Sequence, residues 1–231
     1  MVFIFTFGNS EVNKLSKKNI NNWLTYYYLD PQPELTMDAI KTFSNQKVLS
    51  RKNSLAPLSS FLSSIFEQNP DLVKTNIDEL IKYSEAERKV FILAIYYSDM
   101  NNKFKFIEKL SQTEKEKLML ERMNTAKFIK IIDMDAISPT ILDQHWAGFM
   151  ASGNKVHIFR IIQALEFIDS KNGSHVITGN AARWSLISNS VQHKKVLEIC
   201  KSTLKEVPKY IKKHLEEIIS SVELKLKDSK I

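Results

Sequence analysis

Apolar residues recur along most of this chain at intervals of three and four positions, which is the spacing that gives a helix one apolar face. The clearest case lies near the C-terminal end, where apolar residues from Ile211 to Leu226 are interspersed with lysines and glutamates. Convincing strict alternation of apolar and polar residues, the mark of a half-buried strand, is absent. The pattern predicts an all-α protein with no sheet.

Local start signals divide this pattern into separate helices. A capping side chain followed by proline, which suits the first turn of a helix, occurs at Asn69-Pro70 and Ser138-Pro139. A capping-box pattern begins at Thr113, with a glutamate three residues later. These signals predict about 11–12 helices, near residues 19–29, 33–45, 55–68, 70–82, 85–98, 101–111, 114–124, 139–151, 155–168, 176–190, 193–206 and 208–227.

The predicted helices form a loose series of pairs. Five times an aromatic-rich helix precedes one with an isoleucine and leucine face, as where residues 61–66 precede Ile77 and Leu80. Reused helix pairs are typical of stacked αα-repeat proteins, although tetratricopeptide arrays keep a fixed repeat of about 34 residues and these intervals vary. We therefore expect stacked antiparallel helix pairs in an irregular, tetratricopeptide-like superhelix. An α-bundle whose pairs only look alike is the alternative.

The two ends of the chain differ in their predicted organisation. Residues 1–18 are expected to be a flexible N-terminal segment, in which Met1–Phe7 is apolar but too short for a complete signal peptide. It is either the remnant of a signal peptide or a disordered or docked end. Residues 19–231 are expected to form a single helical domain, with a division near 125–138 where the periodicity is weakest. The default compartment is the cytoplasm, or the periplasm if the segment is a signal remnant.

Glycine content excludes two large classes of nucleotide-dependent enzyme. The chain has 5 glycines, too widely spaced for the loops that cradle a phosphate with backbone N–H groups. A nucleophile elbow of the Gly-x-Ser-x-Gly type is also missing, so α/β-hydrolase chemistry has no support. No run of residues approaches the roughly 18 apolar positions that cross a bilayer.

Charge indicates a protein partner more than a nucleic acid. The net charge is +7, and five of the 33 basic residues are arginines. Because arginine is the residue that forks onto phosphates and guanine edges, this lysine-rich composition is typical of a solvated surface. An excess of lysine over acidic residues between 192 and 231 favours an acidic partner. Nucleic-acid binding through these C-terminal helices is a weaker alternative.

Residues that could carry chemistry do not fall into known constellations. The 5 histidines include no pair spaced for a helix-borne zinc site, and Asp133 and Asp135 lack the glycine turn of a calcium loop. The single cysteine, Cys200, lies on the apolar side of a predicted helix and is expected to be a buried thiol. We predict no catalytic residue, no metal site and no cofactor.

Aromatic residues suggest where a partner would bind. Each of the three tryptophans falls on the first helix of a predicted pair, where such side chains usually fill the space between helices. Alternatively, some of them line a concave peptide groove to which arginines add polar contacts. The residues assigned to this predicted groove are Trp23, Tyr27, Trp146, Arg160 and Arg183.

Two stretches resemble a loose group of uncharacterised bacterial all-helical proteins with degenerate, tetratricopeptide-like helix pairs. One runs through residues 23–33 and continues through 56–70. The other runs through residues 142–153 and 160–165, with a mild departure at Met150. The resemblance implies helix packing and capping but no activity. Some members of that group are exported, which adds weight to the signal-remnant interpretation.

The sequence thus predicts a soluble, non-enzymatic module that presents a helical surface to a protein or peptide. An enzyme or enzyme modulator whose site forms from distant helices is the alternative, and a polar cleft with strongly perturbed pKa values would distinguish it. The oligomeric state and the partner are not indicated by any pattern.

Overall fold

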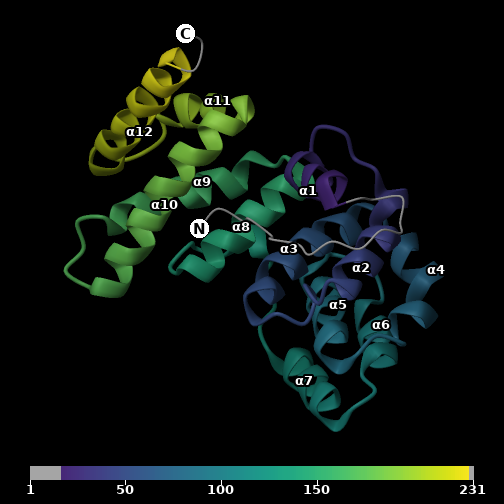
Figure 1. Ribbon diagram of the computed structural model, residues 1–231. Helices are drawn as coiled ribbons and strands as arrows, with labels where there is room; N and C mark the ends of the chain where they lie inside the picture. Colours follow the sequence, from purple (N-terminus) through teal and green to yellow (C-terminus); the bar gives the residue numbers. More distant parts are fainter. Residues whose placement is uncertain (1–16, 229–231) are drawn as a thin grey trace. The chain divides into compact units, whose positions relative to one another are not determined.

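A computed structural model describes residues 17–228, and every regular element in this range is helical (Figure 1). The prediction of an all-α protein is confirmed, since the described residues contain no strand. The predicted N-terminal segment, apart from Lys17 and Lys18, lies outside the described residues, as does its interpretation as a signal remnant. None of the helices within 17–228 is long and apolar enough to cross a membrane.

Within residues 17–228, seven α-helices lie before Ala126 and five lie after Ser138. The first seven are α1 (Lys17–Tyr26), α2 (Thr36–Asn45), α3 (Lys52–Gln68), α4 (Pro70–Leu80), α5 (Glu85–Tyr97), α6 (Lys103–Leu110) and α7 (Glu114–Thr125). The others are α8 (Pro139–Ser152), α9 (Lys155–Gln163), α10 (Gly173–Gln192), α11 (Lys194–Thr203) and α12 (Lys209–Asp228). Three short 3-10 helices are η1 (Pro33–Leu35), η2 (Ile131–Asp133) and η3 (Ala164–Phe167).

The capping signals begin helices where the sequence places them. At the start of α7, Thr113 Oγ1 accepts a hydrogen bond from the Glu116 N–H at 3.4 Å, and Glu116 Oε2 accepts one from the Thr113 N–H at 2.8 Å. Helix α4 begins at Pro70, as expected for a residue that lacks an N–H. The predicted helix over 155–168 is divided, because its last turn is the 3-10 helix η3.

The described chain divides into two compact units. The N-terminal unit comprises residues 17–133 together with 147–153, and the C-terminal unit comprises 134–146 together with 154–228. The boundary at Asp133 lies inside the stretch 125–138, where the sequence periodicity is weakest. The last turn of α8 is grouped with the N-terminal unit, where Met150 C=O accepts a hydrogen bond from the Tyr28 N–H at 2.9 Å.

The N-terminal unit is built around an aromatic core. Its most extensive helix contact joins α3 and α5, which are not neighbours in the chain, and α7 lies at one end of the unit (Figure 1). The rings of Trp23, Tyr27 and Phe61 meet edge to face, with centroids 5.2 to 5.6 Å apart. Phe43 and Phe91 are fully buried in the same cluster. Aromatic side chains therefore pack among the aliphatic residues of this core.

A charged pair is also buried in the N-terminal unit. Arg88 on α5 donates two hydrogen bonds of 2.9 Å to the Glu116 carboxylate, and both side chains are at least nine-tenths buried. Burial by itself raises the pKa of Glu116, but hydrogen bonds from Arg88 and from backbone N–H groups lower it below its usual range. The pair joins α5 to the start of α7, since Glu116 is also the capping residue of α7.

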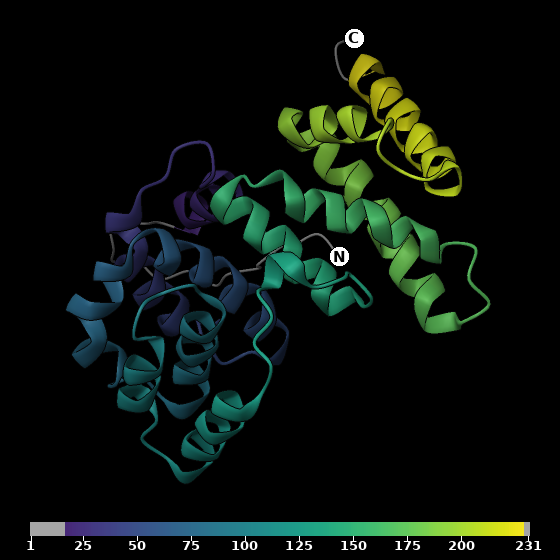
Figure 2. The ribbon, with the colours of Figure 1, turned by 180° about the vertical axis from the view of Figure 1, so that it is seen from behind.

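The C-terminal unit has an aliphatic core. The predicted apolar stripe of α12 is buried at Ile211, Leu215, Ile218 and Val222, and Leu226 is half-buried. Helix α10 packs against α12, α11 and η3, and both views show α11 beside α12 (Figures 1 and 2). The stacking of helix pairs as a tetratricopeptide-like superhelix stays a prediction.

One glycine allows two elements of the C-terminal unit to approach closely. A Cβ atom at Gly179 on α10 would lie 2.6 Å from the backbone nitrogen of Ile168 and 2.8 Å from the carbonyl carbon of Phe167. These distances are far shorter than van der Waals contact, so only glycine fits without a backbone shift. The inward face of α10 is otherwise made largely of small residues, namely Thr178, Ala182, Ser185 and Ser190, with Leu186 among them.

Candidate functional site: the surface of helices α10 to α12

The aromatic residues assigned to the predicted groove are buried. Trp23 is 6% exposed, Tyr27 2% and Trp146 5%. Burial raises the pKa of Tyr27 to about 12, and the nearby Glu34 carboxylate adds to this effect. These three side chains pack inside the protein, so they do not line an open groove.

The two arginines assigned to the same groove are ion-paired. Arg160 Nη1 donates to Asp135 Oδ1 at 3.0 Å, and Arg183 Nη2 lies 3.1 Å from Glu217 Oε2. Arg183 therefore joins α10 to α12 inside the C-terminal unit. Arg160 and Arg183 belong to the C-terminal unit, whereas Trp23 and Tyr27 belong to the N-terminal unit.

The third tryptophan, Trp184, lies on the surface. Its exposed fraction is 51%, and on the same helix Ile177 is 64% and Val191 39% exposed. The three residues are spaced seven apart, which places them along one side of α10 as a continuous line. We call this line the α10 stripe, consisting of Ile177, Trp184 and Val191.

The α10 stripe has almost no charge around it. Arg183 is the one lysine, arginine, aspartate or glutamate residue within the 20 residues of α10, and its charge is matched by Glu217. Positions that flank the stripe carry small, amide or aliphatic side chains, such as Asn180, Ala181 and Ile187. A half-exposed tryptophan between two exposed aliphatic residues is therefore available for contact with another apolar surface.

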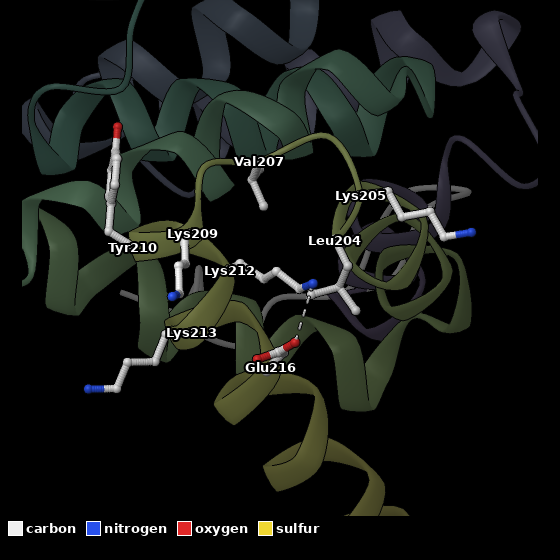
Figure 3. Close-up of a pocket in the computed structure, with 8 residues that line it drawn as sticks. All are labelled: Leu204, Lys205, Val207, Lys209, Tyr210, Lys212, Lys213 and Glu216. Carbon is white, nitrogen blue, oxygen red and sulfur yellow. Dashed lines mark ion pairs between the residues drawn. The ribbon is translucent and has the colours of Figure 1, made fainter.

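A basic hollow lies at the turn between α11 and α12 (Figure 3). Its volume is about 1020 Å³. Val207 turns toward the hollow, and Lys212 extends toward Glu216, whose carboxylate lies 3.9 Å from the ammonium group. We call this feature the basic hollow; its lining residues are Leu204, Lys205, Val207, Lys209, Tyr210, Lys212, Lys213 and Glu216.

Two buried histidines in the C-terminal unit contact each other. His145 Nε2 lies 2.9 Å from the carbonyl oxygen of Met134, which can only accept, so this nitrogen carries the proton. In neutral His145 the other ring nitrogen, Nδ1, is then an acceptor, and it receives a hydrogen bond from His157 Nδ1 at 3.1 Å. Burial lowers the pKa of both rings below the usual value for histidine, so both are neutral near pH 7.

Other reactive side chains are buried or isolated. Cys200 is fully buried, and burial raises the pKa of its thiol to about 11, which disfavours the nucleophilic thiolate. Within residues 17–228 no three histidine, cysteine or acidic side chains are grouped so as to hold a metal ion. Among the surface features of the described residues, the α10 stripe and the basic hollow are the candidates for binding that we consider.

Sequence reasoning missed the exposure of Trp184, although a signal was present. Gly179, Ala182 and Ser185 are small residues at intervals of three, and small residues on one face of a helix favour close packing on that side. The larger residues of α10 then have to lie elsewhere on its circumference. For the basic hollow the sequence contains a partial signal, because lysines exceed acidic residues between 192 and 231 and this excess favours an acidic partner.

Comparisons with protein-family models, with curated proteins and with solved structures find no match for this chain. The function must therefore be argued from the surface of α10 to α12.

Proposed function

We propose that this protein is a non-enzymatic binding module whose α10 stripe receives an amphipathic helix of a partner protein. The observation that carries the proposal is the exposure of Trp184 between Ile177 and Val191 at heptad spacing. Tryptophan is among the residues that contribute most to protein interfaces, because its large ring loses contact with water when a partner covers it.

The shape of the stripe favours a helical partner. Three apolar residues spaced seven apart match the seam along which two helices pack, and an apolar face on the partner would be complementary. A membrane surface is a poorer fit, because helices that lie on membranes carry lysine or arginine along their polar face. Helix α10 has Arg183 alone, and this residue is already paired with Glu217.

The enzyme alternative receives less support from the described residues. It requires a polar cleft with charged groups of perturbed pKa. The strongly perturbed side chains His145, His157, His193 and Cys200 are instead buried, and Asp143, whose pKa burial raises to about 6, is half-buried. The hydrogen bonds of His145 with His157 and with the Met134 carbonyl oxygen are those expected of two neutral histidines packed inside the C-terminal unit.

Site-specific photo-crosslinking tests the proposal. We would place a benzophenone side chain at Ile177 or Val191 in the full chain and irradiate it in lysate of the native host. The expected result is the same crosslinked protein from both positions, joined through a segment with apolar residues at helical spacing. Adding Trp184→Glu should remove the product, because a carboxylate would have to be buried against the partner.

Matched controls use exposed leucines elsewhere. Leu224 on α12 is 62% exposed and Leu118 on α7 is 48% exposed, similar to the stripe residues. The same benzophenone at these two positions should not give the product. Identical products from all four positions, or a product that survives Trp184→Glu, would contradict the proposed role of α10.

A further inference from the structure

We infer that the basic hollow is a second docking surface, which takes an acidic peptide segment carrying one apolar side chain. The hollow is formed entirely by the turn that follows α11 and the start of α12, within the C-terminal unit (Figure 3). This inference does not depend on the α10 stripe, because the two surfaces share no residue.

The charge around the hollow is unbalanced. Four lysines and one glutamate line it, and the Glu216 carboxylate is already 3.9 Å from Lys212. Lys205, Lys209 and Lys213 form no ion pair with any acidic group in residues 17–228, and all three are exposed. In Figure 3 the side chains of Lys205 and Lys213 extend outward on opposite sides of the hollow, so acidic residues at separate positions of a bound peptide can each meet an ammonium group.

The position of the lysines on α12 adds to this imbalance. Lys209 is the first residue of the helix, and the first turn contains no acidic side chain. The N-terminus of a helix carries a partial positive charge, so lysines placed there are not compensated by the helix itself. Carboxylates from a partner would supply the missing negative charge.

An apolar floor makes the hollow more selective than a patch of lysines. Leu204 and Val207 are half-buried and Tyr210 is exposed, and all three line the hollow. Figure 3 shows Val207 turned toward its centre. A leucine- or phenylalanine-sized side chain between two acidic residues would bury itself against this floor while its neighbours reach the lysines.

The distribution of charge favours a short peptide over a nucleic acid. Further along α12, Glu217 and Glu223 separate the basic start of the helix from Lys225 and Lys227 in its last turn, so these lysines do not form one continuous basic surface. A duplex carries one negative charge per roughly 1.7 Å and would meet those carboxylates. The hollow also lacks arginine, whose planar fork recognises phosphate in a bidentate manner.

Selection from a random library of short displayed peptides tests the inference with the full chain. Wild type should enrich peptides with several aspartates or glutamates around one leucine or phenylalanine. An enriched peptide should bind Lys209→Glu/Lys213→Glu about tenfold more weakly, because two attractive contacts become repulsive. This double variant should remain folded, since both lysines are exposed and glutamate is favoured over lysine at position 209, in the first turn of the helix.

The matched control is Lys225→Glu/Lys227→Glu, which changes the net charge equally at the other end of α12. It should alter affinity by no more than about twofold, and Val207→Ser should weaken binding without changing its salt dependence. Peptides in which asparagine or glutamine replaces each aspartate or glutamate should not bind. Equal losses in the two double variants, no enrichment of acidic peptides, or tighter binding of an oligonucleotide of matched charge would overturn the inference.

Discussion

The two units differ in where their large aromatic residues lie. In the N-terminal unit, Trp23, Tyr27 and Phe91 are buried among neighbouring helices. In the C-terminal unit Trp146 is buried in a largely aliphatic core, while Trp184 and Tyr210 are more than half exposed. An aromatic residue near the middle of a helix is therefore no guide to burial by itself. What decides is whether the opposite face of that helix carries small residues that pack closely, as on α10.

The units also differ in how they use charge. The N-terminal unit buries the Arg88–Glu116 pair, and its surface hollow near η1 and α4 is lined by Glu34 and Asp71 without any cation. The C-terminal unit surrounds its hollow with lysines and holds all 5 histidines of the chain. The proposed binding surface for an acidic segment therefore belongs to one unit, and we expect sensitivity to mild acid in the same unit.

The largest expected contrast comes from removing one aromatic ring in each unit. Phe91→Ala should lower the free energy of unfolding by about 3–5 kcal/mol, because it leaves a cavity in a closely packed core. Trp184→Ala should change it by less than about 0.5 kcal/mol, since half of that ring is already in water. Urea denaturation followed by circular dichroism measures both values. Comparable losses would mean that Trp184 supports the fold.

Mild acid should destabilise the C-terminal unit more than the N-terminal unit. Burial depresses the pKa of His145 and His157, so the neutral rings favour the folded state above the unfolded pKa of about 6.5 and that contribution is lost as pH falls below it. Glu116, whose folded pKa is also depressed, retains its contribution until pH falls below about 4.3. At pH 5 we expect the C-terminal unit to lose about 2 kcal/mol for each of His145 and His157, while the N-terminal unit is unchanged.

Hydrogen exchange with mass spectrometry, corrected for the intrinsic effect of pH, resolves this difference by segment. Peptides from α9 to α12 should lose protection between pH 6.5 and 5, and peptides from α3 and α5 should keep it. Parallel loss in both units would show that the histidine pair does not set the acid response.

A smaller effect tests whether close backbone approach, rather than large rings, holds the C-terminal unit together. Gly179→Ala would force a Cβ atom against the backbone of Phe167 and Ile168 and should cost about 1–3 kcal/mol. Gly173→Ala is the control, because nothing lies within 4 Å of the added atom. Thermal unfolding measures the effect, and Gly179→Ala should have the lower midpoint temperature of the two variants. Equal midpoints would mean that η3 shifts to accommodate the added Cβ atom without loss of stability.

Much of the fold follows from the sequence because helix formation has local causes. The glutamate three residues after Thr113 and the proline at 70 specify helix starts, and the stripe from Ile211 to Val222 specifies the buried face of α12. The contact of α3 with α5 is different, because it joins elements that are not consecutive. No local pattern records which of several apolar faces will meet.

Of the properties of the candidate site, the sequence predicts only the excess of positive charge. The lysine excess near the C-terminus is a matter of composition, so it could be read directly from the chain. The burial of Trp23 and the exposure of Trp184 depend on which side of each helix faces its neighbours. The His145–His157 contact requires two helices to be positioned within a hydrogen-bond length, and residues twelve apart give no sequence signal of this.

The uneven burial of the three tryptophans gives the protein a built-in optical reporter. Trp23 and Trp146 are shielded, whereas Trp184 meets water over half its surface. The long-wavelength part of the emission, and the part that iodide quenches, should therefore come from the α10 stripe. A partner that covers this stripe would shift the spectrum to shorter wavelength, so binding can be followed on the unlabelled protein by the residue that makes the contact.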